Sequence, residues 1–152
     1  MLYLLAALIG VVAGLRAMTA PAAVSWGVLL AWMSVGGWAA FMGHWIAAAV
    51  FTVLAIVELV TDQLPTTPSR KVPVQFGARL VSGAFCGAVI ASATGSWIGG
   101  AVAGIVGAVV GTLGGAELRA RIAAAFGSDR PAALIEDAVA ILGGLLIVAA
   151  VA

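Results

Sequence analysis

Long apolar runs, separated by short breaks of polar residues, glycine or proline, dominate the chain. They delimit six segments, at residues 2–15, 18–33, 41–62, 76–93, 97–118 and 131–152. A helix needs about 20 apolar residues to cross a bilayer, because its rise is about 1.5 Å per residue. The third, fifth and sixth segments meet this length. The first two are shorter and are predicted to form thin spans or a re-entrant pair.

The connection between the first two segments contains an arginine and a proline. One helix over residues 2–33 would carry Arg16 and Pro21 near its middle. Proline removes a helical hydrogen-bond donor and clashes with the preceding turn. We therefore predict a break within residues 14–21. The alternative, one bent span over residues 2–33, gives five crossings and places Arg16 inside the membrane.

Composition gives the protein class. Of 152 residues, 64% are hydrophobic and 9% are charged, against about 45–50% and 25% in soluble domains. Seven basic and six acidic side chains are too few to cover a soluble surface or to attract a polyanion. This composition excludes a water-soluble enzyme, a disordered chain and a nucleic-acid binder. It predicts an all-α integral membrane bundle of about six transmembrane or partly re-entrant helices, a single domain over residues 1–152.

The positions of the basic residues predict the topology. They gather after the third segment and around the end of the fifth: Arg70, Lys71, Arg119, Arg121 and Arg130. The positive-inside rule places both regions in the cytoplasm. Alternation then places the turn at Gly36 and both termini outside, which describes a multi-pass protein. Residues 65–73 form a polar, proline-rich loop. The three segments on each side of it, in halves 1–66 and 74–152, would have opposite orientations, as in the inverted repeats of transporters.

A stripe of glycines follows the fifth segment at spacings of four and three residues: Gly100, Gly104, Gly107, Gly111 and Gly114. Such residues let two membrane helices approach closely. The partner is either another helix of this chain or a second subunit. A homodimer, and a non-transporting assembly protein packed through this stripe, are therefore among the hypotheses.

Charged residues at membrane depth form the candidate site. Glu58 and Asp62 share one helix face, and Glu136 and Asp137 lie at a similar depth in the last segment. Two arginines from other segments, Arg16 and Arg79, lie toward the same side. Because an unpaired charge costs about 2.5–3.5 kcal/mol at membrane depth, we expect all six to converge and pair.

Three interpretations of this cluster stay open. It is a structural ion-pair network, a path for a small ion or solute, or a hydrolytic or transferase site. Oxygen ligands would suit magnesium or manganese, but no metal motif accompanies them, and no cofactor is indicated. Transport is the leading hypothesis and catalysis the least favoured. In the proline-rich loop, Thr66, Thr67 and Ser69 beside Arg70 and Lys71 are either a solvated loop or a phosphate site.

Three short motifs resemble a known family. They are GLRA at residues 14–17 followed by Pro21, ELVTDQLP at 58–65 and ALIEDAVA at 133–140. In this order, over nearly the whole chain, they resemble the bacterial membrane family catalogued as domain of unknown function 4126. Met18 stands where that family has an aromatic residue and Gln63 where it has lysine, which weakens any role for a further cation there.

The resemblance implies a location in the bacterial cytoplasmic membrane but no activity, since the family has none established. It also implies a set of characteristic polar positions, which are Arg16, Glu58, Asp62, Glu136 and Asp137. These are among the residues that membrane energetics selected.

Overall fold

The structure, a computed structural model, describes residues 1–64 and 66–151; Pro65, in the predicted proline-rich loop, and Ala152 lie outside the described residues. Within this part of the chain all regular elements are helical, as predicted. They are α1 (Leu2–Leu15), α2 (Thr19–Leu29), the 3-10 helix η1 (Gly37–Gly43), α3 (Trp45–Thr61), α4 (Pro73–Ser92), α5 (Trp97–Phe126) and α6 (Asp129–Ala149).

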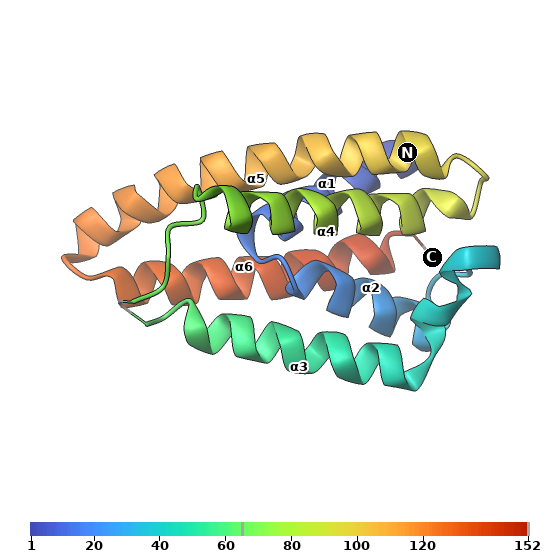
Figure 1. Cartoon of the computed structure of the whole chain (residues 1–152), viewed down its shortest axis with the longest axis horizontal. Coiled ribbons are helices and arrows are strands. Elements are labelled where there is room, and N and C mark those ends of the chain that lie inside the picture. Colours follow the sequence, from blue (N-terminus) through green and yellow to red (C-terminus); the bar gives the residue numbers. More distant parts are fainter. Residues whose placement is uncertain (65, 152) are drawn as a thin grey trace.

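Helices α3 to α6 lie along the long axis of the molecule and alternate in direction (Figure 1). The connections at residues 62–72 and 127–128 lie at one end, which we call the charged end. Residues 30–44 and 93–96 lie at the opposite end, which we call the tryptophan end (Figure 1). The two groups of loops are therefore separated as the predicted topology requires.

Among the described residues, three helices are long and apolar enough to cross a membrane, namely α4, α5 and α6. A fourth span results if η1 and α3 cross together, with a bend of 69° between them. Large apolar side chains such as Val57, Val106 and Leu146 are exposed on the outer faces of the helices, as expected where lipid replaces water. The fold supports a helical membrane protein, while six crossings stay a prediction.

The first two segments form two short helices. The backbone at Arg16 is extended, with φ −141° and ψ 110°, and ends α1. At 1.5 Å per residue, α1 is about 21 Å long and α2 about 16 Å, against about 30 Å for the hydrocarbon core. Figure 1 shows α1 running from the tryptophan end into the bundle and α2 returning. We call this pair the hairpin; a single bent helix over residues 2–33 is excluded.

Several helix ends differ from the sequence prediction; for example, the predicted third segment 41–62 is divided between η1 and α3. Two of the differences have a clear local cause. Helix α5 continues beyond residue 118 to Phe126, because the charged stretch after it is rich in alanine, leucine, arginine and glutamate, which all favour helix. Left-handed Gly127, at φ 66°, then ends it. Helix α2 ends at Leu29 rather than at residue 33, since Ala31 adopts a positive φ of 58°.

Glycines bring α5 against its neighbours. A Cβ atom at Gly100 or Gly104 would meet backbone atoms of α4, and one at Gly107 or Gly111 would meet backbone atoms of α1. Gly114 has no atom within 4 Å of its Cβ position. Four glycines of the stripe thus pack α5 inside this chain.

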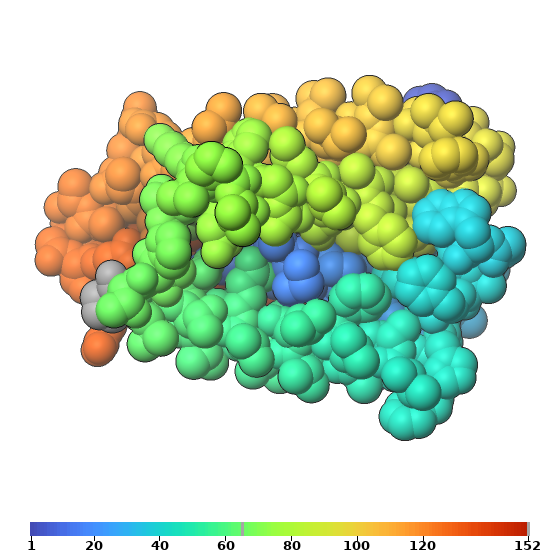
Figure 2. Space-filling model, in the orientation of Figure 1, coloured from blue at the N-terminus to red at the C-terminus, as the bar shows by residue number. Residues whose placement is uncertain are grey.

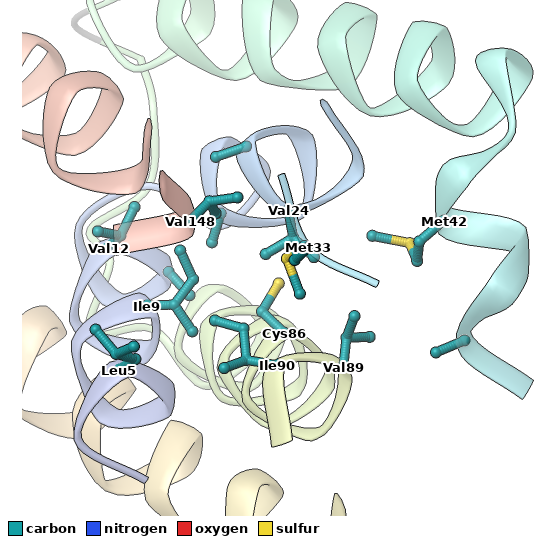
Figure 3. Packing of buried hydrophobic residues seen from close by; sticks show 14 of the residues in the cluster. Leu5, Ile9, Val12, Val24, Met33, Met42, Cys86, Val89, Ile90 and Val148 are labelled. Carbon is teal, nitrogen blue, oxygen red and sulfur yellow. The ribbon is translucent and has the colours of Figure 1, made fainter. Parts of the chain in front are cut away.

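Apolar side chains fill the bundle between the hairpin turn and the tryptophan end. Ile9, Val24, Met42, Cys86 and Ile90 are each fully buried and come from α1, α2, η1 and α4 (Figure 3). Burial among such side chains makes Cys86 a packing residue. This apolar core closes the molecule toward the tryptophan end.

On one face of the molecule, atoms of the hairpin are visible between α3 and α4 (Figure 2). A cavity of about 340 Å³ lies there, bordered by Pro21, Phe51, Val81 and Phe85, among others. Helix α3 packs chiefly against α2 and η1, and within it only Ala48 and Ala55 are buried. Of the described helices, α3 is therefore among the least embedded.

The halves run in opposite directions, but they differ in their helices. Helix α2 has 11 residues, whereas α5, its counterpart in the second half, has 30. The inverted repeat stays a prediction.

Candidate functional site

The turn of the hairpin is buried inside the bundle, so its backbone polar groups require partners from the protein. The carboxylate of Glu58 accepts hydrogen bonds from the backbone N–H groups of Ala17 and Met18, each at 2.8 Å. Met18 is the N-cap of α2 and Ala17 directly precedes it, at the end where a helix leaves its first donors unsatisfied. Glu58 thus caps α2 from α3, and its charge suits the positive end of the helix.

The carbonyl groups of the same turn are held from α4. Arg79 Nη1 donates to the oxygens of Gly14 and Leu15 at 3.0 and 2.6 Å. The hydroxyl of Ser82 donates to the oxygen of Ala17 at 2.5 Å. Irregular backbone is tolerated at membrane depth only where protein or enclosed water satisfies it. Glu58 and Arg79 therefore stabilise the break itself.

Arg16 is the centre of the site, with a fully buried side chain. Its Nε donates to Oδ1 of Asp137 at 2.7 Å, and its Nη1 pairs with Oδ2 of Asp62. Nη2 lies 2.6 Å from Asp137 Oδ1 and 3.8 Å from Glu136 Oε2. One guanidinium thus joins α3 and α6 to the hairpin turn.

A second layer of pairs surrounds Glu136 toward the charged end. Arg70 binds both oxygens of this carboxylate, with Nη2 at 2.8 Å from Oε2. Arg119 Nη1 donates to Oε2 at 3.2 Å, and the rest of its guanidinium holds Asp129. Gln63 Nε2 donates to Asp137 Oδ2 at 3.2 Å.

We call this group the charged cluster. Its members come from four helices (α3 to α6), the hairpin turn and the proline-rich loop, and are Arg16, Arg70, Arg79, Arg119, Glu58, Asp62, Asp129, Glu136 and Asp137. All six residues selected from the sequence lie within it.

Two further arginines were missed from the sequence. Of the basic residues at the end of the fifth segment, Arg121 is exposed over 76% of its side chain, whereas Arg119 is exposed over 15% and joins the cluster. A signal existed, because Arg119 lies four and eight residues after Gly115 and Gly111, so that it continues one buried helix face. No pattern in the sequence indicated that Arg70 extends from its loop to bind Glu136.

A polar cavity separates the charged cluster from the charged end. It has a volume of about 310 Å³ and is partly open. Arg70, Arg79, Arg119, Asp62 and Asp129 line it together with Thr67 and Ser69 of the proline-rich loop. Solute can thus reach the cluster from this end of the molecule.

The carboxylates of the cluster face arginines and backbone N–H groups. Among the described residues, no group of three or more histidine, cysteine, aspartate or glutamate side chains is placed to hold a metal ion. Guanidinium and carboxylate groups of this kind can each bind a small group of opposite charge.

Comparison of the chain with protein-family models, with curated proteins and with solved structures finds no match.

Proposed function

We propose that this is a multi-pass protein of the bacterial cytoplasmic membrane that transports a small ion or solute through the charged cluster. One observation carries the proposal: a broken helix pair turns at bundle depth, surrounded by buried charges, beside a polar cavity. Broken helices and buried ionisable residues mark solute paths in membrane proteins. Membership of the family of domain of unknown function 4126 belongs to the same proposal and rests on its three motifs.

The two ends of the molecule suggest how access alternates. The polar cavity opens at the charged end, and a depression of about 640 Å³ bordered by Gly37, Trp38 and Trp97 lies at the tryptophan end. The apolar core separates them. The structure is thus compatible with a state open to the charged side and closed to the other.

The pairs of Arg79 are the contacts that we expect to rearrange. Its Nη2 lies 3.8 Å from Glu58 Oε1 and 3.7 Å from Asp62 Oδ2, beyond hydrogen-bond range. The less embedded helix α3 carries both acids, so its movement with α2 would change these distances first. In this mechanism the bound solute competes with the cluster's own pairs, which couples binding to the opening of the path.

An assembly protein packed through the glycine stripe is less favoured. Gly100, Gly104, Gly107 and Gly111 are occupied by α1 and α4 of the same chain. A homodimer, if formed, would have to use other faces of the molecule.

The test is ion flux in liposomes that contain the purified full chain. A panel of protons, sodium, potassium, magnesium, chloride and phosphate is compared between wild type, Glu58→Gln and Glu136→Gln. The matched control is Glu117→Gln, because Glu117 is exposed and pairs only along its own helix. Loss of a hydrogen-bonded charge costs about 1.5–3 kcal/mol, so we expect flux to fall about tenfold or more in the first two variants and not in the control.

Two results would refute transport through this cluster. One is a wild type that moves no ion of the panel. The other is flux in Glu58→Gln and Glu136→Gln that equals that of Glu117→Gln. Gel filtration and helical circular dichroism of each variant exclude misfolding as the cause of a loss.

A further inference from the structure

Arg79 stands apart from the other arginines of the charged cluster. Arg16, Arg70 and Arg119 each hydrogen-bond a carboxylate. Arg79 hydrogen-bonds only backbone carbonyl groups, through Nη1. Its side chain is 2% exposed, and its Nε has no hydrogen-bond partner among the described residues. A buried charged donor without an acceptor is costly, so this atom indicates that something further binds there.

The geometry of the guanidinium group limits which acceptors would fit this part of Arg79. Nε–H and one Nη2–H point in the same direction and form one of the two-pronged edges that match the paired oxygens of a carboxylate or phosphate. In Arg79 the Nη2 of this edge lies 3.7 Å or more from its nearest acids. Among the described residues this edge makes no hydrogen bond and has only the two long ion pairs of Nη2, while Nη1 is used by the hairpin turn.

Arg79 also lines the polar cavity, and the cavity favours an anion. Three arginines and two aspartates line it: Asp62 is paired with Arg16, Asp129 with Arg119 and Arg70 with Glu136. Among the described residues, Arg79 is thus the one lining arginine that makes no hydrogen bond to a carboxylate. The other three carboxylates of the cluster do not line it. The hydroxyl groups of Thr67 and Ser69 complete the wall. Guanidinium and hydroxyl donors on several sides suit a tetrahedral oxyanion better than a planar one.

We propose that the polar cavity at the charged end binds a phosphate group through the Nε and Nη2 edge of Arg79, with Arg70 and the loop hydroxyls around it. The group is either free phosphate or the headgroup of an anionic phospholipid, since the two share this chemistry. The inference rests on the proposed function and deepens it, because it names the class of solute that reaches the cluster. It also supports the interpretation of the proline-rich loop as a phosphate site, because the buried Arg79 lines the same cavity as the loop residues Thr67 and Ser69.

The test measures binding at equilibrium in two arms. In the first, inorganic phosphate is titrated by calorimetry into the full chain in a zwitterionic detergent, with chloride at matched ionic strength as reference. In the second, native mass spectrometry follows phosphatidic acid that stays bound to the chain after its release from phosphatidylcholine nanodiscs containing phosphatidic acid. Saturable binding in the first arm identifies the ligand as free phosphate. Saturable binding in the second identifies it as a lipid headgroup. Either result supports the proposal.

Arg79→Lys is the decisive variant. Lysine keeps the charge and can still reach the carbonyl groups of the hairpin turn, but it lacks the two-pronged edge. We expect affinity to fall about 10- to 100-fold, since a hydrogen bond to a charged group is worth one to two factors of ten. Arg121→Lys makes the same change at an exposed arginine of the same end and should leave binding unchanged.

A second variant keeps the test valid if Arg79→Lys does not fold. Ser69→Asp adds a negative charge to the wall of the cavity at an exposed loop residue and leaves the ion pairs of the cluster intact. It should weaken binding about tenfold or more at low salt. Absence of saturable binding in both arms overturns the proposal, as does binding that neither Arg79→Lys nor Ser69→Asp weakens.

The outcome is separable from that of the proposed function. No flux is needed for either binding arm, so a protein that binds phosphate but moves no ion refutes transport alone. A protein that moves an ion through the cluster but binds no phosphate refutes this inference alone.

Discussion

Adding a methyl group at either of two glycines of α5, in two separate variants, tests whether α5 packs closely on α1. Gly107→Ala puts a Cβ atom against the carbonyl oxygen of Ala7 and within 2.9 Å of the backbone N of Val11, both on α1. Gly114→Ala puts the same atom where nothing lies within 4 Å. The two sites share one helix, one substitution and one sequence pattern, and differ in what the methyl group meets.

The magnitude follows from two terms. Replacing glycine by alanine inside a helix stabilises it by about 0.5–1 kcal/mol, and this term applies to both variants. Overpacking costs about 1–3 kcal/mol. This term applies only at Gly107, where the added methyl group meets backbone atoms of α1, which cannot move aside as a flexible side chain can. The propensity term cancels in the comparison, so Gly107→Ala should be less stable than Gly114→Ala by about 1–3 kcal/mol.

The assay is unfolding of the purified protein in mixed detergent micelles, followed by tryptophan fluorescence. Under thermal unfolding, about 2–4 °C per kcal/mol converts the expected difference into about 2–12 °C. Gly114→Ala should be at least as stable as wild type. Equal stability of the two variants, or a lower stability of Gly114→Ala, would show that α5 does not pack on α1 through Gly107.

Two further predictions concern the cluster and the topology. Arg16→Met removes the main ion-pair partner of the carboxylates of Asp62 and Asp137, so it should lower the free energy of unfolding by about 3–5 kcal/mol. Arg121→Met, at an exposed site, should change it by less than about 0.5 kcal/mol. A similar change in both variants would contradict a stabilising network. The thiol of Cys86 is fully buried and should not react with a water-soluble maleimide in intact cells, so labelling reports only on added cysteines. Gly36→Cys should be labelled from outside, and Ser69→Cys only after permeabilisation. Labelling of both from one side would refute the assigned orientation.

The helical class and the convergence of charge were predictable because lipid imposes them locally. In a bilayer every backbone group must be satisfied within its own segment, so a run of apolar residues between breakers is a helix whatever it packs against. The same solvent makes an isolated charge costly, so six ionisable residues at matching depth had to find one another. Glu58 and Arg79 could be selected on that ground alone.

Their roles could not be read in the same way. Which arginine meets which carboxylate depends on the rotation of each helix about its axis, and that rotation is set by close backbone contacts such as Gly104 with Gly83. The recruitment of Arg70 and Arg119 and the capping of the hairpin turn by Glu58 arise only when these contacts bring distant segments together. The Nε group of Arg79, which has no hydrogen-bond partner among the described residues, is likewise a property of the packed bundle. Whether a donor finds an acceptor depends on all the side chains that surround it.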